Sequence, residues 1–181
     1  MNSKDIVYIA LFSALTTALG LFPPLTLPIG VPLTAQSMGC MLAGSIIGAK
    51  RGSIALCIYI LLIVIGFPVL AGGKGGLGVM LSPSGGFILA WPLAAGLIGY
   101  LYEKNLRSLT IIKEACFIVL GGIVLVYAIG IPWVAVFAEL SLYQAAIGTL
   151  FFLPGDIVKV ILVIFVTRLI RRAYPSIDIR N

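Results

Sequence analysis

Six long apolar stretches dominate this chain and constrain its fold more than any other feature. They lie at about residues 6–22, 34–49, 53–71, 85–102, 109–131 and 145–170. Each is close to the length that an α-helix needs to cross the roughly 30 Å hydrocarbon core of a bilayer. Because lipid cannot satisfy backbone hydrogen bonds, spanning segments of this kind favour helices. We therefore predict an all-α integral membrane protein whose six transmembrane helices form a single domain, residues 1–181.

The overall composition excludes an ordinary soluble domain. Hydrophobic residues make up 61% of the chain and charged residues only 10%, whereas soluble domains carry roughly 25% charged residues. The mean hydropathy is +1.18. The lipid bilayer is therefore the expected environment for most of the surface.

The first apolar stretch has one alternative interpretation. Lys4 precedes it, as in a secretory signal peptide, but Asp5 interrupts the basic segment that such a peptide needs. Removing this stretch would also leave an odd number of helices. We expect it to be retained as the first transmembrane helix.

The basic residues indicate an orientation. In the six-helix arrangement most of them fall on one side of the membrane: Lys4, Lys50, Arg51, Lys104, Arg107, Lys113, Arg168, Arg171, Arg172 and Arg180. Lys74 falls on the other side, and Lys159 falls inside a span. Basic residues concentrate in cytoplasmic loops, so both termini are predicted to be cytoplasmic (N-in, C-in). The net charge of +6 then orients the protein and does not indicate nucleic-acid binding.

Several kinds of chemistry lack their residues in this sequence. Histidine is absent, and Cys40, Cys57 and Cys116 lie singly inside apolar runs, which matches neither a disulfide framework nor a zinc pattern. No GxxxxGK[ST] phosphate-binding motif is present. We expect no metal or cofactor in this chain. If it moves a solute uphill, the energy must come from another chain.

The last apolar stretch contains the most specific local pattern. Pro154-Gly155 interrupts it, and a helix restarting there would place Asp156 in its first turn, where a carboxylate suits the helix dipole. Lys159 follows three residues later on the same face. It lies about 14 Å from the interface marked by Arg168, at 1.5 Å per residue.

A lysine at that depth costs roughly 2.5–3.5 kcal/mol unless it finds water or a counter-ion. The pair could be a neutralised contact that only packs the bundle. Alternatively, it could form a ligand site open to the outside, as broken helices at this depth often do. Lys159 would then meet an anionic group of the ligand, and Asp156 would accept hydrogen bonds from the ligand or hold the lysine.

A glycine-rich segment lies on the predicted outer side. It runs from Ala71 to Gly78 and continues into Ser82-Pro83-Ser84-Gly85-Gly86-Phe87. Glycines allow backbone to approach a ligand closely and allow a lid to move. A plain flexible linker is an equally good interpretation of the segment alone.

Small residues recur at every fourth position in two stretches. Ala10, Ala14 and Ala18 form such a strip in the first, and Gly44 and Gly48 do so in the second. Strips of this kind let another helix approach closely. The partner could be another protein or another helix of this chain.

Taken together, these segments resemble the biotin-specific substrate-binding component (BioY family) of energy-coupling factor transporters, over essentially the whole chain. The resemblance rests on the six-helix plan, the alanine strip, residues 31–36 (VPLTAQ), the segment 82–87 (SPSGGF) and residues 153–159 (LPGDIVK). This chain has Ser82, Ser84 and Phe87 where the family usually shows glycine, threonine and tyrosine. Phe87 cannot donate a hydroxyl hydrogen bond.

The resemblance implies a function and a set of residues. It implies high-affinity biotin capture at a bacterial plasma membrane, docking through Ala10, Ala14 and Ala18 onto a transmembrane coupling (T) protein, and transport driven by two cytoplasmic ATPases. Trp and Tyr near span ends are also common interfacial anchors. The ligand-binding residues predicted on these grounds are Asp156, Lys159, Gln36, Thr34, Gly73, Ser84, Gly85, Trp91 and Tyr143.

Three rival functions stay open at this point. One is a substrate-binding component for another vitamin such as thiamin, although a buried lysine would repel that cation. Another is a membrane-embedded enzyme that uses Asp156 and Lys159 as acid and base. The third is a structural helix bundle. Which end of biotin would meet either residue does not follow from the sequence.

Overall fold

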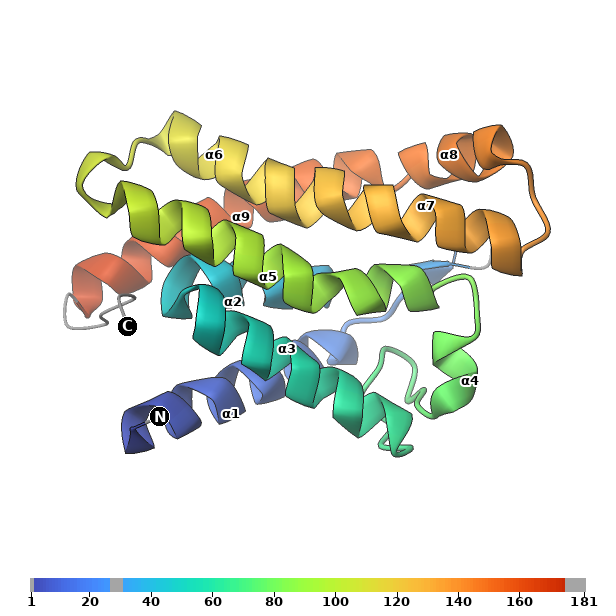
Figure 1. Ribbon diagram of the computed structural model, residues 1–181, viewed down its shortest axis with the longest axis horizontal. Coiled ribbons are helices and arrows are strands. Elements are labelled where there is room, and N and C mark those ends of the chain that lie inside the picture. The colour runs from blue at the N-terminus through green and yellow to red at the C-terminus, as the bar shows by residue number, and fades with distance from the viewer. Residues whose placement is uncertain (1, 27–30, 175–181) are drawn as a thin grey trace.

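The computed structural model describes residues 2–26 and 31–174, and these are mainly helical (Figure 1). Arg180 and residues 27–30 of the first predicted outer connection lie outside the described residues. A short antiparallel pair of strands joins the first two helices, with Leu25 opposite Leu33. In chain order the elements are α1 (Ser3–Ala18), η1 (Leu19–Leu21), β1 (Leu25–Thr26), β2 (Pro32–Leu33), α2 (Ser37–Ile47), α3 (Ala49–Val64), α4 (Leu77–Met80), α5 (Gly85–Asn105), η2 (Leu106–Ser108), α6 (Ile111–Val119), the π-helical η3 (Leu120–Leu125), α7 (Val126–Phe137), α8 (Leu142–Leu150) and α9 (Leu153–Ala173).

Each of the six predicted stretches contains helix, but not all are long enough to span a bilayer alone. Three helical runs among the described residues are long and apolar enough to do so: Ser3–Leu21, Gly85–Ser108 and Ile111–Phe137. Helices α8 and α9 make a fourth if the pair, bent by 52°, is one span. Helix α2 has 11 residues, or about 16 Å at 1.5 Å per residue. The chain is therefore a mainly helical membrane protein, and the count of six spans stays a prediction.

The boundary between the second and third helices lies earlier than predicted. Lys50 and Arg51 belong to the first turn of α3, which begins at Ala49. Gly48 makes the break with a φ of +85°, a conformation that suits glycine because it has no Cβ. The Glu103 carboxylate on α5 accepts a hydrogen bond from the Ala49 N–H at 2.7 Å. Two helices thus meet without a loop.

Helix α5 forms the centre of the bundle and packs against α2, α3 and α7. In the most apolar 18-residue stretch of the run Gly85–Ser108, 61% of the residues are buried inside the chain. The corresponding share is 28% for Ser3–Leu21 and 33% for Ile111–Phe137. A Cβ added to Gly44 of α2 would meet the Ala95 carbonyl oxygen of α5. The close approach predicted at Gly44 is therefore internal packing.

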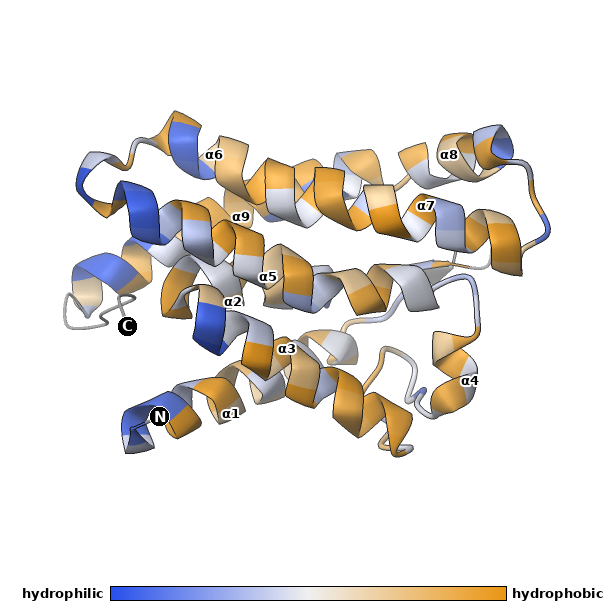
Figure 2. Cartoon of the chain, viewed as in Figure 1, coloured by the Kyte–Doolittle hydropathy of each residue, from blue (hydrophilic) through white to orange (hydrophobic). Residues whose placement is uncertain are grey.

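Polar residues gather at one end of the bundle. Figure 2 shows them at the end that holds both termini, where α1 and α3 begin and α5 and α9 finish. The opposite end carries β1, β2 and α4 (Figure 1). The start of α1 and the end of α9 thus lie at the same end of the bundle.

The alanine strip of α1 faces away from the rest of the chain. Ala10, Ala14 and Ala18 are all exposed, and Val7 and Leu11 on the same side are 62% and 57% exposed. Helix α1 packs through its other side on α3 and α2. Internal packing therefore does not explain the strip.

Candidate ligand-binding site

A buried ion pair lies at the start of α9. Lys159 Nζ lies 2.8 Å from Asp156 Oδ1, and the two residues are only 9% and 6% exposed. Leaving either charge buried without its partner costs roughly 3–5 kcal/mol. Each side chain therefore stabilises the charge of the other.

Two further helices complete the hydrogen bonding of this pair. The Tyr127 hydroxyl of α7 donates to Asp156 Oδ2 at 2.6 Å. Lys159 Nζ also donates to the Ser37 hydroxyl at the start of α2, at 2.9 Å. The resulting cluster carries no net charge and connects three helices at one point.

The local sequence accounts for the position of the pair. Helix α9 begins at Leu153 with Pro154 in its first turn, where the missing amide donor leaves no intrahelical hydrogen bond unmade. Asp156 follows in that first turn, as predicted. The 52° bend from α8 ends the preceding helix and directs the first turn of α9 into the bundle.

Two cavities meet beside this cluster. The smaller, of about 60 Å³, is lined by Asp156, Lys159, Tyr127 and Ser37 among others. The larger, of about 280 Å³, lies under the glycine-rich segment. The cavities share Val31, Pro32, Thr34, Phe87 and Trp91 as lining residues, so they occupy adjacent sides of one wall.

The larger cavity combines aromatic and apolar walls with polar groups. Its lining includes Ser82 and Ser84, whose hydroxyl oxygens lie 2.9 Å apart. Lys74 also lines it and is exposed. Such a cavity accepts a mostly apolar molecule with a few polar atoms, and Lys74 supplies a positive charge at its edge.

Phe87 lines both cavities. Its ring packs edge-on against Tyr127 and Phe152, with centroids 6.0 and 6.2 Å away. A Cβ added to Gly130 would collide with this ring, so the wall is close-packed. Phe87 therefore serves as an apolar surface, consistent with its lack of a hydroxyl.

Gln36 lies in the wall of the larger cavity and bonds to protein groups. Its side-chain amide nitrogen donates to the carbonyls of Thr16 and Val69 at 3.2 and 3.0 Å and contacts the Tyr59 hydroxyl. Its oxygen accepts from the Ala71 N–H at 2.9 Å. Gln36 is 1% exposed, so it joins α1, α3 and the loop after α3.

The structure brings some predicted site residues together and separates others. Asp156, Lys159, Thr34, Trp91, Gln36 and Ser84 line one or both cavities. Gly73, Gly85 and Tyr143 are not among the lining residues of either. Gly85 is buried against the Met80 carbonyl, Gly73 is an exposed loop residue with a φ of +69°, and Tyr143 is 75% exposed on α8.

Four polar residues that line the cavities were not among the predicted site residues: Tyr127, Ser37, Lys74 and Ser82. Tyr127 lies inside an apolar run where a neutral tyrosine is unremarkable. Ser37 follows a predicted site residue directly, which is a weak signal. Lys74 is the one basic residue that the sequence places on the opposite side of the membrane. That isolated position could have indicated a role in ligand binding.

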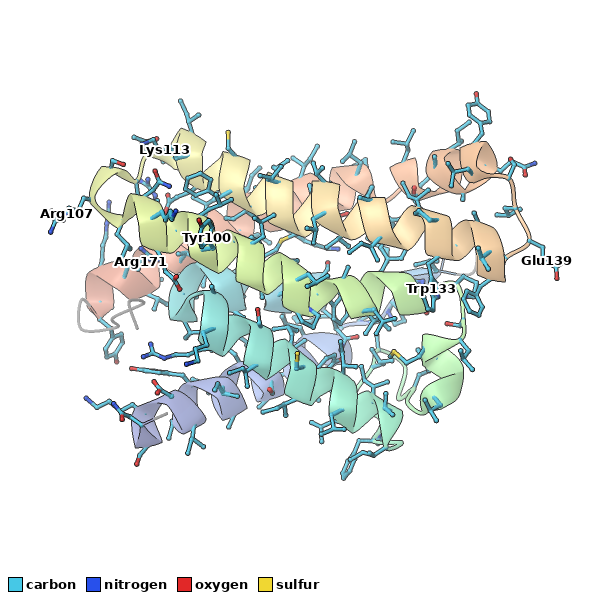
Figure 3. The ribbon with its side chains drawn as sticks, in the orientation of Figure 1. Tyr100, Arg107, Lys113, Trp133, Glu139 and Arg171 are labelled. Carbon is cyan, nitrogen blue, oxygen red and sulfur yellow. The ribbon has the colours of Figure 1, made fainter. Side chains whose placement is uncertain are left out.

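Trp133 lies close to the same end of the molecule. Its indole Nε1 donates to the Ser82 carbonyl at 3.0 Å, which fixes the segment next to Ser84. Figure 3 shows Trp133 at the opposite end of the bundle from Arg107, Lys113 and Arg171. The cavities and the basic surface are therefore at different ends.

Comparison with known proteins adds an independent finding to this geometry. The BioY family model matches residues 1–176. The chain belongs to the BioY family. It is 42% identical over 186 residues to "Biotin transporter BioY" of Rhizobium etli, covering 99% of this chain and 100% of the relative. It is 40% identical to "Probable biotin transporter BioY" of Bacillus subtilis, covering 96% and 94%.

A solved structure agrees with the family assignment. It is described as the S-component for biotin from an ECF-type ABC transporter. It superimposes on this chain with a TM-score of 0.89 at 34% sequence identity, and the match covers 95% of each chain. The fold of this chain is thus that of a substrate-binding component.

Proposed function

We propose that this chain is the biotin-binding subunit of an ECF-type uptake transporter in a bacterial plasma membrane. The observation that carries the proposal is the neutral cluster of Asp156, Lys159, Tyr127 and Ser37 beside a cavity of about 280 Å³. Biotin offers an apolar ring and chain for such a cavity, a ureido group for paired donors and acceptors, and a carboxylate for a cation. The family and the relatives named as biotin transporters support the same ligand.

We propose that the ureido end of biotin faces the Asp156–Lys159 cluster. Asp156 already compensates Lys159, so a ligand carboxylate placed there would leave a net negative charge in a buried site. Burying an uncompensated charge costs several kcal/mol. A ureido group avoids this cost, because its N–H groups suit the carboxylate and its C=O suits the ammonium.

The carboxylate of biotin then extends toward Lys74. This lysine is exposed at the edge of the larger cavity, and its charge can pair with the ligand at little desolvation cost. Trp91 and Phe87, which line both cavities, would contact the ring and chain between the two polar ends. This orientation assigns Lys159 a different partner from the anionic group expected from the sequence.

The membrane arrangement belongs to the same proposal. We propose six membrane-crossing segments with both termini cytoplasmic, so that the cavities open near the outer surface. The clustering of basic residues at the end that holds the termini supports this orientation (Figure 2). The exposed alanine strip of α1 would dock onto a transmembrane coupling protein, and two cytoplasmic ATPases would supply the energy.

A titration tests the proposed ligand directly. Purified chain in detergent should change its tryptophan fluorescence on addition of biotin, because Trp91 lines both cavities and the chain has only two tryptophans. Thiamin, a cation, should give no response at the same concentrations. A response to thiamin or another vitamin, with none to biotin, would contradict the proposal.

The relatives are named as transporters, so we interpret the Asp156–Lys159 pair as a binding group and not as a catalytic acid and base. Biotin recovered unchanged after incubation with the protein is the expected result. Chemical conversion of biotin by the purified chain would require the enzyme interpretation instead.

A further inference from the structure

A third cavity lies at the opposite end of the bundle from the ligand site. It has a volume of about 270 Å³ and is lined by Leu109, Glu114, Arg168, Arg171 and Arg172. The three arginines come from the last turns of α9 at spacings of three and four residues, so they share one face. Glu114 lies on the neighbouring helix α6.

The charges in this cavity do not balance. The Glu114 carboxylate, 2% exposed, accepts a hydrogen bond from Arg168 Nε and compensates that one arginine. Arg171 and Arg172 leave an excess of two positive charges in the lining. A half-buried excess of this kind favours an anionic occupant.

Arg171 is held in place by contacts that leave part of its guanidinium unused. Its Nη2 donates to the Ser45 carbonyl at 2.6 Å, and its guanidinium carbon lies 5.0 Å from the centroid of the Tyr102 ring. Its Nε is buried and has no hydrogen-bond partner among the described residues. Arg171 is thus an oriented cation in the cavity lining, and Arg172 is exposed beside it.

The surroundings of the cavity are apolar and exposed. Ile112 on α6 is 76% exposed, and Phe165 and Leu169 on α9 are 66% and 57% exposed. In the membrane arrangement proposed above, these side chains would face lipid chains and the arginines would lie near the level of the lipid headgroups. Basic pockets between helices at the membrane surface bind anionic headgroups.

We propose that this cavity, lined by Arg168, Arg171 and Arg172, binds a phosphate group, supplied by the headgroup of an anionic phospholipid. The inference does not rest on biotin. The site lies at the end that holds the termini, where Figure 3 also shows Arg107 and Lys113. Arginine suits phosphate because its planar fork can donate two hydrogen bonds at once.

Native mass spectrometry of the detergent-purified full chain tests the proposal. Phosphatidylglycerol should remain bound at collision energies that remove phosphatidylcholine, whose headgroup carries no net charge. Arg172→Gln should reduce the bound fraction of phosphatidylglycerol several-fold. Arg107→Gln removes another exposed charge at the same end, outside the cavity lining, and should leave the bound fraction unchanged.

Each alternative outcome has a clear consequence. Equal retention of phosphatidylglycerol and phosphatidylcholine would overturn the site. An equal loss of bound phosphatidylglycerol in Arg172→Gln and Arg107→Gln would also overturn it, because general surface charge would then explain the binding. Inorganic phosphate is the second arm. If it raises the Tm of lipid-free protein as much as phosphatidylglycerol does, and Arg172→Gln abolishes the effect, the phosphate site stands and the lipid source is overturned. Biotin titration of both variants separates this result from the proposed function, since neither residue lines the ligand cavities.

Discussion

Gln36 in the wall of the larger cavity donates a hydrogen bond to the backbone carbonyl of Thr16, at 3.2 Å. Thr16 lies between Ala14 and Ala18 in the chain, so this bond joins the ligand cavity to the helix that carries the exposed alanine strip. The same side chain also binds the backbone at Val69 and Ala71. Helix α1 and the loop that borders the cavity are therefore held by one buried amide.

The first prediction concerns this amide. Gln36→Glu keeps the shape but places carboxylate oxygens opposite the carbonyls of Thr16 and Val69. Each buried polar group left unsatisfied costs about 1–3 kcal/mol, so Tm should fall by several degrees and biotin affinity should fall with it. Thermal unfolding followed with and without biotin measures both effects.

Gln144→Glu is the matched control for that substitution. Gln144 accepts from Ser141 through its side-chain oxygen at an exposed helix start, and a carboxylate can do the same. Its Tm should stay within a degree or so of wild type. A Gln36→Glu protein that is equally stable would show that the amide does not hold the loop and α1.

The second prediction concerns the buried pair. Asp156→Asn leaves Lys159 buried without its counter-ion, and the expected loss of stability is about 3–5 kcal/mol. Replacing both residues, as Asp156→Asn with Lys159→Met, removes the buried charge and should recover most of that stability. Neither variant should bind biotin with wild-type affinity. A double variant that is no more stable than the single one would argue against charge pairing as the cause.

The third prediction concerns the hydroxyl that supports Asp156. Tyr127→Phe removes the hydrogen bond to Asp156 Oδ2 without changing the ring. Hydrogen bonds to charged groups contribute about 1.5–3 kcal/mol to stability, so the Tm should fall. The Kd for biotin should also rise, because Asp156 is then less well fixed to meet the ligand.

Tyr143→Phe makes the same chemical change at an exposed residue of α8. The geometry predicts no change in Kd, whereas the sequence placed Tyr143 among the ligand-binding residues. A large effect at Tyr143 and none at Tyr127 would show that the ligand binds elsewhere.

The difference between these two tyrosines illustrates how far the sequence could predict the site. Asp156 and Lys159 stood out because charge inside a membrane is costly and needs a reason. A tyrosine in an apolar run carries no such cost, so nothing in the sequence distinguished Tyr127 from any other. Its position also depends on the π-helical turn at Leu120–Leu125 just before it, and no residue pattern predicts that turn.

Gln36 shows a different limit. The sequence indicated a polar residue next to the site, and the structure places it there. The sequence could not indicate that the carbonyls of Thr16 and Val69 would come together around that amide, because those contacts depend on how three segments pack. The helical segments themselves were predictable because apolar length alone specifies them, whereas the start of α3 at Ala49 depends on a glycine conformation.

The fourth prediction separates the two lysines. Lys74→Ala should weaken biotin binding several-fold but leave the methyl ester of biotin nearly unaffected, because an exposed ion pair contributes about 0.2–1 kcal/mol. Lys159→Ala should weaken both ligands equally, since the ureido end is common to them. Lys104→Ala, an exposed lysine near Tyr100 at the far end, should affect neither. If Lys159→Ala instead weakened biotin but not its methyl ester, and Lys74→Ala weakened both equally, the proposed orientation of biotin would be reversed.

The fifth prediction concerns the exposed strip of α1. Ala14→Trp adds a large side chain on the face that carries Ala10 and Ala18, away from α2 and α3. Biotin binding by the purified chain should be unchanged, because the strip contributes no lining residue to either cavity. Uptake of labelled biotin by cells that also produce the partner subunits should fall to background, because a flat strip allows close helix contact and an indole prevents it.

Val136→Trp is the control, since Val136 is 73% exposed on α7, on the other side of the bundle from α1 (Figure 1). Uptake by this variant should match wild type. Equal loss of uptake in both variants would mean that any bulky residue on the lipid-facing surface interferes, and loss of binding in Ala14→Trp would mean that α1 acts through the cavity. Loss of uptake in Ala14→Trp alone, with biotin binding retained, would identify the alanine strip as the surface through which this chain meets its partner.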